Sequence, residues 1–303
     1  LDKIWVGKPV VCVAAGPSLS KNIEFLKTIQ KDVFIIAVSA VLKPLLDKGI
    51  KPDMITMLDM GEEVMRYLEG IDITDIFTVI ELSCYHGIIE KYPSKYIFSM
   101  SAMRASKLMQ DMIPMLGIDV DQKFVLPGAM TVATLSILIA NIMGASKIIL
   151  LGQDLAYSDK THVEGSRFSH PTEIVESKGQ KYIEFKIHDG EQTLSMELIP
   201  VKGFWGDTVS SSYQFTTYRE YMEHLIRAYG MDVVNATEGG SYIEGTEHIT
   251  LKEAYHRDIK PVKAIKQGLN IPMHRQGYPY DKLSRVIEDI EKISKGRIPS
   301  GAT

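Results

Sequence analysis

The chain has 303 residues, of which 45% are hydrophobic and 24% are charged, and its formal net charge is −4. This size suffices for a large buried core, and the negative charge argues against a nucleic-acid partner held by a basic surface. No apolar run reaches the roughly 18 residues that a membrane-spanning helix needs, and no secretory signal is visible at the start. We therefore expect a cytoplasmic protein that binds neither nucleic acid nor membrane.

Strand-like and helix-like patterns alternate along the first half of the chain. Short apolar runs typical of buried strands occur at 10–14, 33–38, 53–58, 76–81, 96–98 and 147–151. Apolar residues at helical spacing separate most of them, and a long apolar pattern follows the turn from Gly128 to Thr131 and runs to Met143. This alternation predicts a doubly wound, mostly parallel, Rossmann-like α/β sheet.

The alternation stops near residue 158. Period-two patterns at 182–187 and 194–198 flank the turn residues His188-Asp189-Gly190 and predict a β-hairpin. A helical pattern at 217–229 and a strand pattern at 231–234 then restore the α/β order. We predict a nucleotide-binding portion at 1–157, a loop and hairpin insertion over the strand ends at 158–215, completion of the α/β domain at 216–258 and a helical tail at 259–303.

The first strand is followed by a turn suited to phosphate. It reads Ala15-Gly16-Pro17-Ser18-Leu19 and leads directly into a helical pattern. Gly16 permits close backbone approach, and the first N–H groups of a helix favour an anion. The alternative is an ordinary strand-to-helix turn, because the segment lacks the glycine-rich dinucleotide and P-loop motifs.

Polar residues follow several of the predicted strands. In open α/β sheets ligands bind beyond the carboxyl ends of the strands, so we expect these residues to converge on one site. Taken singly, each is more often a helix cap or a turn residue than a ligand contact. The candidates are Ser18, Ser39, Asp59, the pair Gln153 and Asp154 after Gly152, and Asn235, Thr237 and Glu238.

Four segments of the sequence, taken in order, carry a resemblance to a known family. They are Ala15-Gly16-Pro17-Ser18-Leu19, the stretch at 43–53, Gly152-Gln153-Asp154-Leu155-Ala156-Tyr157 with Thr161-His162, and Asn235-Ala236-Thr237-Glu238-Gly239-Gly240 with the stretch at 243–246. Together they resemble the central domain of the motility-associated-factor (Maf) flagellin glycosyltransferases. The resemblance covers about residues 7–255 and is most specific at 152–157 and 235–240. The family implies transfer of a pseudaminic, legionaminic or sialic-acid-like nonulosonic acid from its CMP-activated donor to flagellin serine or threonine. Full-length members are longer, so the chain would be a catalytic core or a short homologue.

Two other families share part of the pattern. Bacterial sialyltransferases that use CMP-sialic acid are distantly similar at the Gly-Pro-Ser-Leu turn and at 152–155, but they carry asparagine where this chain has Ser39. Archaeal pterin pyrophosphokinases are similar at the same two segments and transfer pyrophosphate from ATP to a hydroxymethylpterin. Because those kinases are usually shorter and lack both the hairpin and the block at 235–240, the glycosyltransferase is the favoured reading.

The resemblance also suggests roles for single residues. Asp154 or His162 would take the proton of the acceptor hydroxyl. The turn of Ala15, Gly16, Pro17, Ser18 and Leu19 would stabilise the departing phosphate. Asp59, Asn235 and Glu238 would bind base or ribose, and the turn from Gly128 to Thr131 would hold a carboxylate or phosphate.

No required cofactor and no resident metal are expected for glycosyl transfer. Two alternatives remain open. A pyrophosphokinase would need Mg²⁺, held by paired carboxylates such as Asp59 and Asp154. A catalytically silent module that binds a nucleotide sugar or docks flagellin is the third possibility.

Overall fold

The computed structural model describes residues 3–81, 83–99, 126–187 and 192–262. The chain divides into two compact units, Leu1–Ser99 with Ala129–Ile271 and Met100–Gly128 with Pro272–Thr303. Every element named below belongs to the first unit. Residues 263–303 of the predicted helical tail lie outside the described residues, as does the turn around His188.

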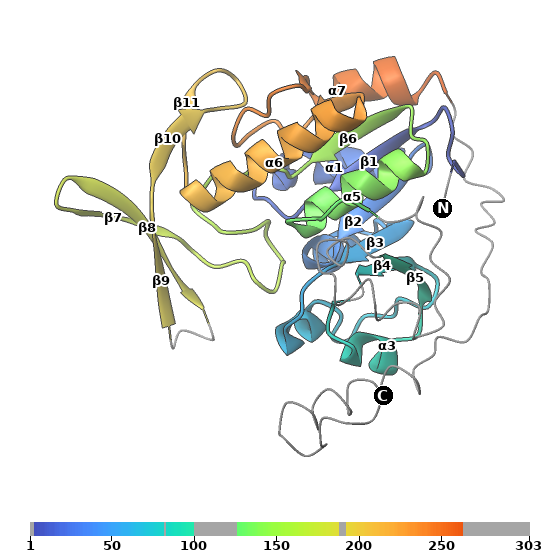
Figure 1. The fold of residues 1–303 in the computed structure, drawn as a ribbon, viewed down its shortest axis with the longest axis horizontal. Coiled ribbons are helices and arrows are strands. Elements are labelled where there is room, and N and C mark those ends of the chain that lie inside the picture. Colours follow the sequence, from blue (N-terminus) through green and yellow to red (C-terminus); the bar gives the residue numbers. More distant parts are fainter. Residues whose placement is uncertain (1–2, 82, 100–125, 188–191, 263–303) are drawn as a thin grey trace, which may run out of the picture. The chain divides into compact units, whose positions relative to one another are not determined.

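The first unit is built on an eight-stranded, fully parallel sheet with the strand order β13-β12-β6-β1-β2-β3-β4-β5 (Figure 1). The strand order reverses between β1 and β6, because the chain adds β2 to β5 on one side of β1 and β6, β12 and β13 on the other. The doubly wound parallel prediction is therefore confirmed. The strands are β1 (Pro9–Val13), β2 (Phe34–Val38), β3 (Met54–Met57), β4 (Phe77–Glu81), β5 (Lys95–Ser99), β6 (Lys147–Leu151), β12 (Val233–Asn235) and β13 (Glu247–His248).

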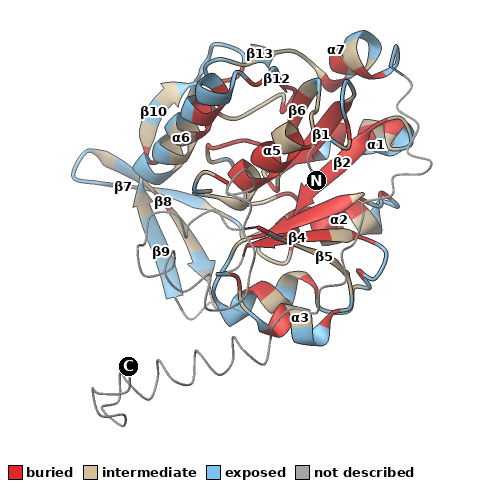
Figure 2. Ribbon diagram, turned by 45° about the vertical axis from the view of Figure 1, so that its right-hand side comes forward, coloured by how far each residue is buried: buried red, intermediate tan, exposed pale blue. Residues whose placement is uncertain are grey.

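Helices cover both faces of this sheet. Figure 1 shows α5 and α6 in front of the sheet and α1 behind it. Burial on both faces explains why the central strands are unbroken apolar runs: every residue of β1, β2 and β3 is buried (Figure 2). The helices are α1 (Leu19–Ile29), α2 (Leu42–Asp47), α3 (Gly87–Lys91), α5 (Val132–Ile142), α6 (Tyr213–Tyr229) and α7 (Leu251–Ala254), with 3₁₀ turns η1 (Ser39–Val41) and η2 (Glu62–Tyr67) and a π-helical turn η6 (Tyr255–Ile259).

Local capping chemistry sets several helix ends. Thr131 forms a capping box with Thr134 at the start of α5. The Ser212 side chain accepts from the Phe215 N–H at the start of α6, and Gly230 ends that helix in the left-handed conformation with φ of 57°. The helices predicted after Thr131 and before Gly230 are therefore confirmed, although α6 begins four residues earlier than its apolar pattern suggested.

The insertion contains two small antiparallel sheets rather than one hairpin. The predicted hairpin is confirmed as β8 (Gln180–Ile187) and β9 (Gln192–Glu197), and β7 (Glu173–Ser177) adds a third strand. The second sheet pairs β10 (Ile199–Lys202) with β11 (Thr208–Ser211), which the sequence analysis missed. Most residues of β7 and β9 are exposed (Figure 2). The described helices include none that is both long and apolar enough to span a membrane.

Candidate functional site

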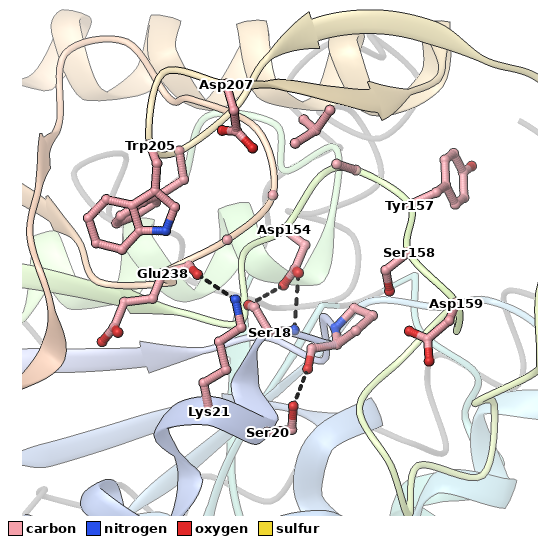
Figure 3. A pocket seen from close by; sticks show the side chains of 16 residues that line it. Ser18, Ser20, Lys21, Asp154, Tyr157, Ser158, Asp159, Trp205, Asp207 and Glu238 are labelled. Atoms are coloured by element: carbon pink, nitrogen blue, oxygen red, sulfur yellow. Dashed lines mark hydrogen bonds between the residues drawn. The ribbon is translucent and has the colours of Figure 1, made fainter.

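A pocket of about 380 Å³ opens at the carboxyl ends of β12, β6 and β1, where the strand order of the sheet reverses. Such a reversal is the usual ligand site of doubly wound folds. Four separate stretches of chain build it (Figure 3). Its lining residues are Pro17, Ser18, Ser20, Lys21, Asp154, Ala156, Tyr157, Ser158, Asp159, Phe204, Trp205, Asp207, Val209, Glu238, Gly239 and Gly240.

Asp154 lies at the centre of the pocket, and only 9% of it is exposed (Figure 3). It follows β6 in a turn whose flanking residues have positive φ, 63° at Gly152 and 47° at Leu155. A positive φ is strained for leucine, and such strain concentrates at functional sites. Burial raises the pKa of the Asp154 carboxyl to about 6, although hydrogen bonds from Ser18 and the charge of Lys21 act in the opposite direction. A carboxylate with this pKa can accept a proton near neutral pH.

The amides of the opening turn are already paired within the protein. Ser18 donates its backbone N–H to Asp154 Oδ1 over 3.1 Å and its hydroxyl to Oδ2 over 2.7 Å. The Gly16 N–H is bonded to the Gly152 carbonyl, and the Leu19 N–H to the Gly16 carbonyl. The free amides expected here are therefore not observed, and the role of this turn in holding a phosphate stays a prediction. The favourable electrostatics of a helix N-terminus are instead used by the protein's own carboxylate.

Gly16 makes this arrangement possible. A Cβ added at Gly16 would lie 1.9 Å from Asp154 Oδ2 and 2.5 Å from the Gly152 carbonyl oxygen. These separations are far below van der Waals contact. The glycine is therefore required by the close approach of the Asp154 carboxylate.

Lys21 supplies the pocket's positive charge, and the sequence analysis missed it. Its Nζ donates to the carbonyl oxygen of Glu238 over 2.9 Å (Figure 3). Glu238 has a left-handed backbone with φ of 58°, and its Oε1 accepts from the Leu251 N–H at the start of α7 over 2.9 Å. The spacing of Lys21, three residues after Ser18 on the first turn of α1, was the available signal.

Three further predicted residues connect the strand ends below the pocket. The Gln153 N–H donates to Thr237 Oγ1 over 3.1 Å, and the Thr237 N–H donates to Asn235 Oδ1 over 3.1 Å. All three are buried, and none lines the pocket. Their observed contacts join the turns after β6 and β12, and thereby fix the positions of Asp154 and Glu238.

The outer wall comes from the turn between β10 and β11, which contributes Phe204, Trp205 and Asp207. Tyr157 and Asp159 line the pocket from the segment after Asp154. None of these residues was predicted as a site residue, although Tyr157 ends one of the segments that carry the Maf resemblance. The Gly203-Phe204-Trp205-Gly206-Asp207 run, with two glycines around two aromatic residues, was a recognisable turn signal.

The remaining candidates do not line the pocket. Ser39 is buried in η1 after β2, and Asp59 lies after β3. Burial raises the pKa of Tyr67 and of Cys84, and the charge of Asp59 adds to both shifts. His162 lies in the loop after the pocket segment, with Nδ1 3.1 Å from Thr161 Oγ1, and burial lowers its pKa. Ala15 and Leu19 belong to the buried core, Gly152 packs against Ala14, and Gly128 and Thr131 precede α5. The functional roles given to these residues stay predictions.

The carboxylates suggested for Mg²⁺ are not paired at this site, because Asp154 lines the pocket and Asp59 does not. Over the whole described part of the chain, no group of three or more histidine, cysteine, aspartate or glutamate side chains is placed to hold a metal ion. Nucleotide-borne Mg²⁺ commonly takes only one or two protein carboxylates besides the phosphates. Asp154, Asp159 and Asp207 are the aspartates that line the pocket.

Comparisons with known proteins identify a family and a solved structure of similar fold. A family described as 6-hydroxymethylpterin diphosphokinase MptE-like matches residues 1–160. Among solved structures, the chain is similar to the Maf glycosyltransferase from Magnetospirillum magneticum AMB-1, with a TM-score of 0.60 and 16% identity. The likeness covers 94% of this chain and 37% of that one. No curated protein matches the chain.

The two findings bear on different properties. At 16% identity the solved structure shows a shared fold, which agrees with the Maf resemblance in the sequence. The family match ends at residue 160, before the β7–β9 sheet and the β10–β11 hairpin. Because that match spans more than half of the 303 residues, this chain belongs to the MptE-like family.

Proposed function

We propose that this chain is a glycosyltransferase that moves a nonulosonic acid from a CMP-activated donor to serine or threonine of flagellin, with Asp154 as the general base. One observation carries the proposal: a buried carboxylate with a pKa of about 6 faces a pocket that also contains a lysine ammonium. The similarity in fold to a Maf glycosyltransferase supports it. This chain spans 37% of that protein, so donor, acceptor and activity are all part of the proposal.

The pocket residues suit each part of the step. The bond between the anomeric carbon and the phosphate oxygen breaks, and its electron pair leaves with CMP. The acceptor hydroxyl oxygen forms the new bond to the anomeric carbon, and its proton passes to Asp154. Lys21 lies in the same pocket and stabilises the charge that develops on the departing phosphate.

A second function is favoured by the family match, whose description names a 6-hydroxymethylpterin diphosphokinase. In that reaction the hydroxymethyl oxygen attacks the β-phosphorus of ATP, AMP leaves, and Asp154 again takes the hydroxyl proton. Mg²⁺ bound with ATP would neutralise phosphate charge, with Asp159 as a candidate to hold it in the pocket. The third possibility, a module that binds a nucleotide sugar without turnover, needs no base.

One comparison with the 303-residue chain separates these functions. The chain is incubated either with CMP-activated nonulosonic acid and flagellin or with ATP, Mg²⁺ and 6-hydroxymethylpterin, and release of CMP or AMP is followed by chromatography. We expect CMP release with a matching mass increase of flagellin, abolished in Asp154→Asn. AMP release with a diphosphorylated pterin would replace the first function by the second. Binding of the CMP-sugar without turnover would leave the silent module.

A further inference from the structure

The turn between β10 and β11 presents an exposed aromatic ring on a rigid base. Trp205 is 62% exposed, whereas its neighbour Phe204 is 3% exposed. The two rings meet edge to face, with centroids 4.6 Å apart and an interplanar angle of 72°. Phe204 is fixed in turn, because its N–H donates to the Gly240 carbonyl over 2.9 Å and its ring packs against His248. The indole is therefore anchored at one edge and open to the pocket rim.

Asp207 places a carboxylate in the same turn. Its backbone carbonyl accepts from the Gly203 N–H over 2.7 Å, and a Cβ added at Gly203 would lie 2.3 Å from Asp207 Oδ1. The carboxylate is thus folded over the glycine, and it has no hydrogen bond or ion pair with the described part of the chain. Figure 3 shows Trp205 and Asp207 on one side of the pocket, and Ser18, Ser20 and Lys21 on the opposite side.

We propose that Trp205 and Asp207 form a nucleobase subsite selective for bases with an exocyclic amine on the pairing edge, cytosine or adenine, over uracil. Aromatic side chains stack on the faces of bases, and a carboxylate accepts from the amine of cytosine but is repelled by the carbonyl oxygen that uracil has in its place. The subsite rests on the proposed use of a nucleotide substrate, and it fits a CMP donor and ATP equally.

The distribution of charge in the pocket supports this orientation of the nucleotide. Lys21 is the single basic side chain among the residues that line the pocket, and it lies on the wall opposite the turn (Figure 3). Its ammonium has three donors, of which one is used by the Glu238 carbonyl. A phosphate at Lys21 would therefore leave the base directed toward Trp205 and Asp207.

The chain has two tryptophans, and they make the stacking directly observable. Trp5 is 1% exposed and donates its Nε1–H to the Pro9 carbonyl, so a ligand in the pocket does not reach it. We expect CMP and AMP to quench the fluorescence of Trp205, and UMP to bind at least about fivefold more weakly by calorimetry. In Trp205→Phe the quenching disappears while CMP affinity stays within about threefold, because phenylalanine still stacks.

Two substitutions separate stacking from amine recognition. Trp205→Ala should weaken CMP binding by at least about fivefold, whereas Tyr213→Ala, at an exposed aromatic residue that does not line the pocket, should leave it unchanged. Asp207→Asn should bring the affinities for CMP and UMP to within about twofold, because an amide can both donate and accept. Asp75→Asn, at an exposed aspartate that does not line the pocket, is the matched control.

Circular dichroism and melting curves verify the fold of each variant. If CMP binds the wild type but Trp205→Ala and Asp207→Asn bind CMP and UMP as the wild type does, the subsite is wrong and the proposed function stands. If neither CMP, AMP nor UMP binds the wild type, the nucleotide-dependent function itself is wrong. Loss of flagellin binding in Trp205→Ala with unchanged CMP affinity would assign the turn to the acceptor instead and overturn the subsite.

Discussion

The carboxylate of Asp154 accepts two hydrogen bonds from Ser18, one from the backbone N–H and one from the hydroxyl, although the residues lie 136 positions apart in sequence. The contact joins the turn after β6 to the start of α1 and holds both carboxylate oxygens in place. The remaining lone pairs of the oxygens are available to the pocket. One serine therefore both orients the proposed base and opposes the rise in its pKa.

Replacing the two predicted bases should give different results. Asp154→Asn should reduce the proposed transfer by at least about a hundredfold, since proton transfer by a positioned side chain contributes roughly 10²–10⁴ in rate. His162→Gln should retain more than half of the activity, because His162 does not line the pocket. Initial rates of CMP release test both variants, and a loss confined to His162→Gln would assign the base to the histidine.

The rate should depend on pH through Asp154. Only the ionised carboxylate accepts a proton, so activity should fall about tenfold per unit as the pH drops below the pKa of about 6. Ser18→Ala removes a hydrogen bond that lowers this pKa, so its acidic limb should move to higher pH. The pH profile of kcat/KM measures the acidic limb of the wild type and of Ser18→Ala. Identical limbs in the two proteins would show that Ser18 does not tune the titrating group.

The stability of the fold should also report on Asp154. Its pKa is about 6 in the folded protein and 3.8 without the fold, so the folded state binds the proton more tightly. The stabilisation that the protonated carboxyl gives to the fold is present below about pH 4, and it is lost as the pH rises from about 4 to about 6. Urea unfolding of wild type and Asp154→Asn should therefore show the wild type losing stability relative to the variant across this window. A constant difference would place the carboxyl in a solvated environment.

Gly16→Ala should destabilise the protein by about 2 kcal/mol or more, because the new methyl group would overlap Asp154 Oδ2. Gly61→Ala is the matched control. Its φ is −79°, and the new Cβ would come within 3 Å only of Glu63 Oε2, at the end of a flexible side chain. The control should change the free energy of unfolding by less than about 0.5 kcal/mol. Equal effects at the two glycines would mean that the Asp154 side chain moves away from the new methyl group at little cost in free energy.

Lys21→Gln should weaken binding of CMP by about tenfold without changing the melting temperature, because it removes the pocket's cation from an exposed position. Lys27→Gln, on the same helix but away from the pocket, serves as the control. Calorimetry at two salt concentrations measures both variants. Salt should weaken binding to the wild type more than to Lys21→Gln, since screening acts on the lost charge.

The sheet was predictable because its strands are buried on both faces and read as continuous apolar runs. The rule that ligands bind beyond strand ends correctly selected Ser18, Asp154 and Glu238 as neighbours of one pocket. It gave equal weight to Ser39 and Asp59, because local patterns do not reveal strand order. The structure places β2 and β3 on the side of β1 away from β6, so those two residues lie outside the reversal point.

Trp205 and Asp207 could not be predicted as pocket residues from the sequence, for a different reason. Their turn is brought to the pocket by long-range contacts, such as the hydrogen bond from Phe204 N–H to the Gly240 carbonyl, and no local pattern encodes such a contact. The pairing of the Ser18 N–H was missed for the same reason, because its partner is the carboxylate of Asp154, which follows β6. The turn after β1 was recognised from the sequence, but Asp154 was not recognised as the group that accepts the hydrogen bonds of Ser18.

The pocket wall has a mixed origin along the chain. Ser18, Lys21 and Asp154 fall within the matched residues 1–160, whereas the turn at 203–207 and the segment at 238–240 come after them. The part of the wall within residues 1–160 can thus be shared across the family, while the part formed by 203–207 and 238–240 varies independently. Two members could then share a proton acceptor yet differ in the molecules they admit, so family membership alone is a poor guide to substrate choice.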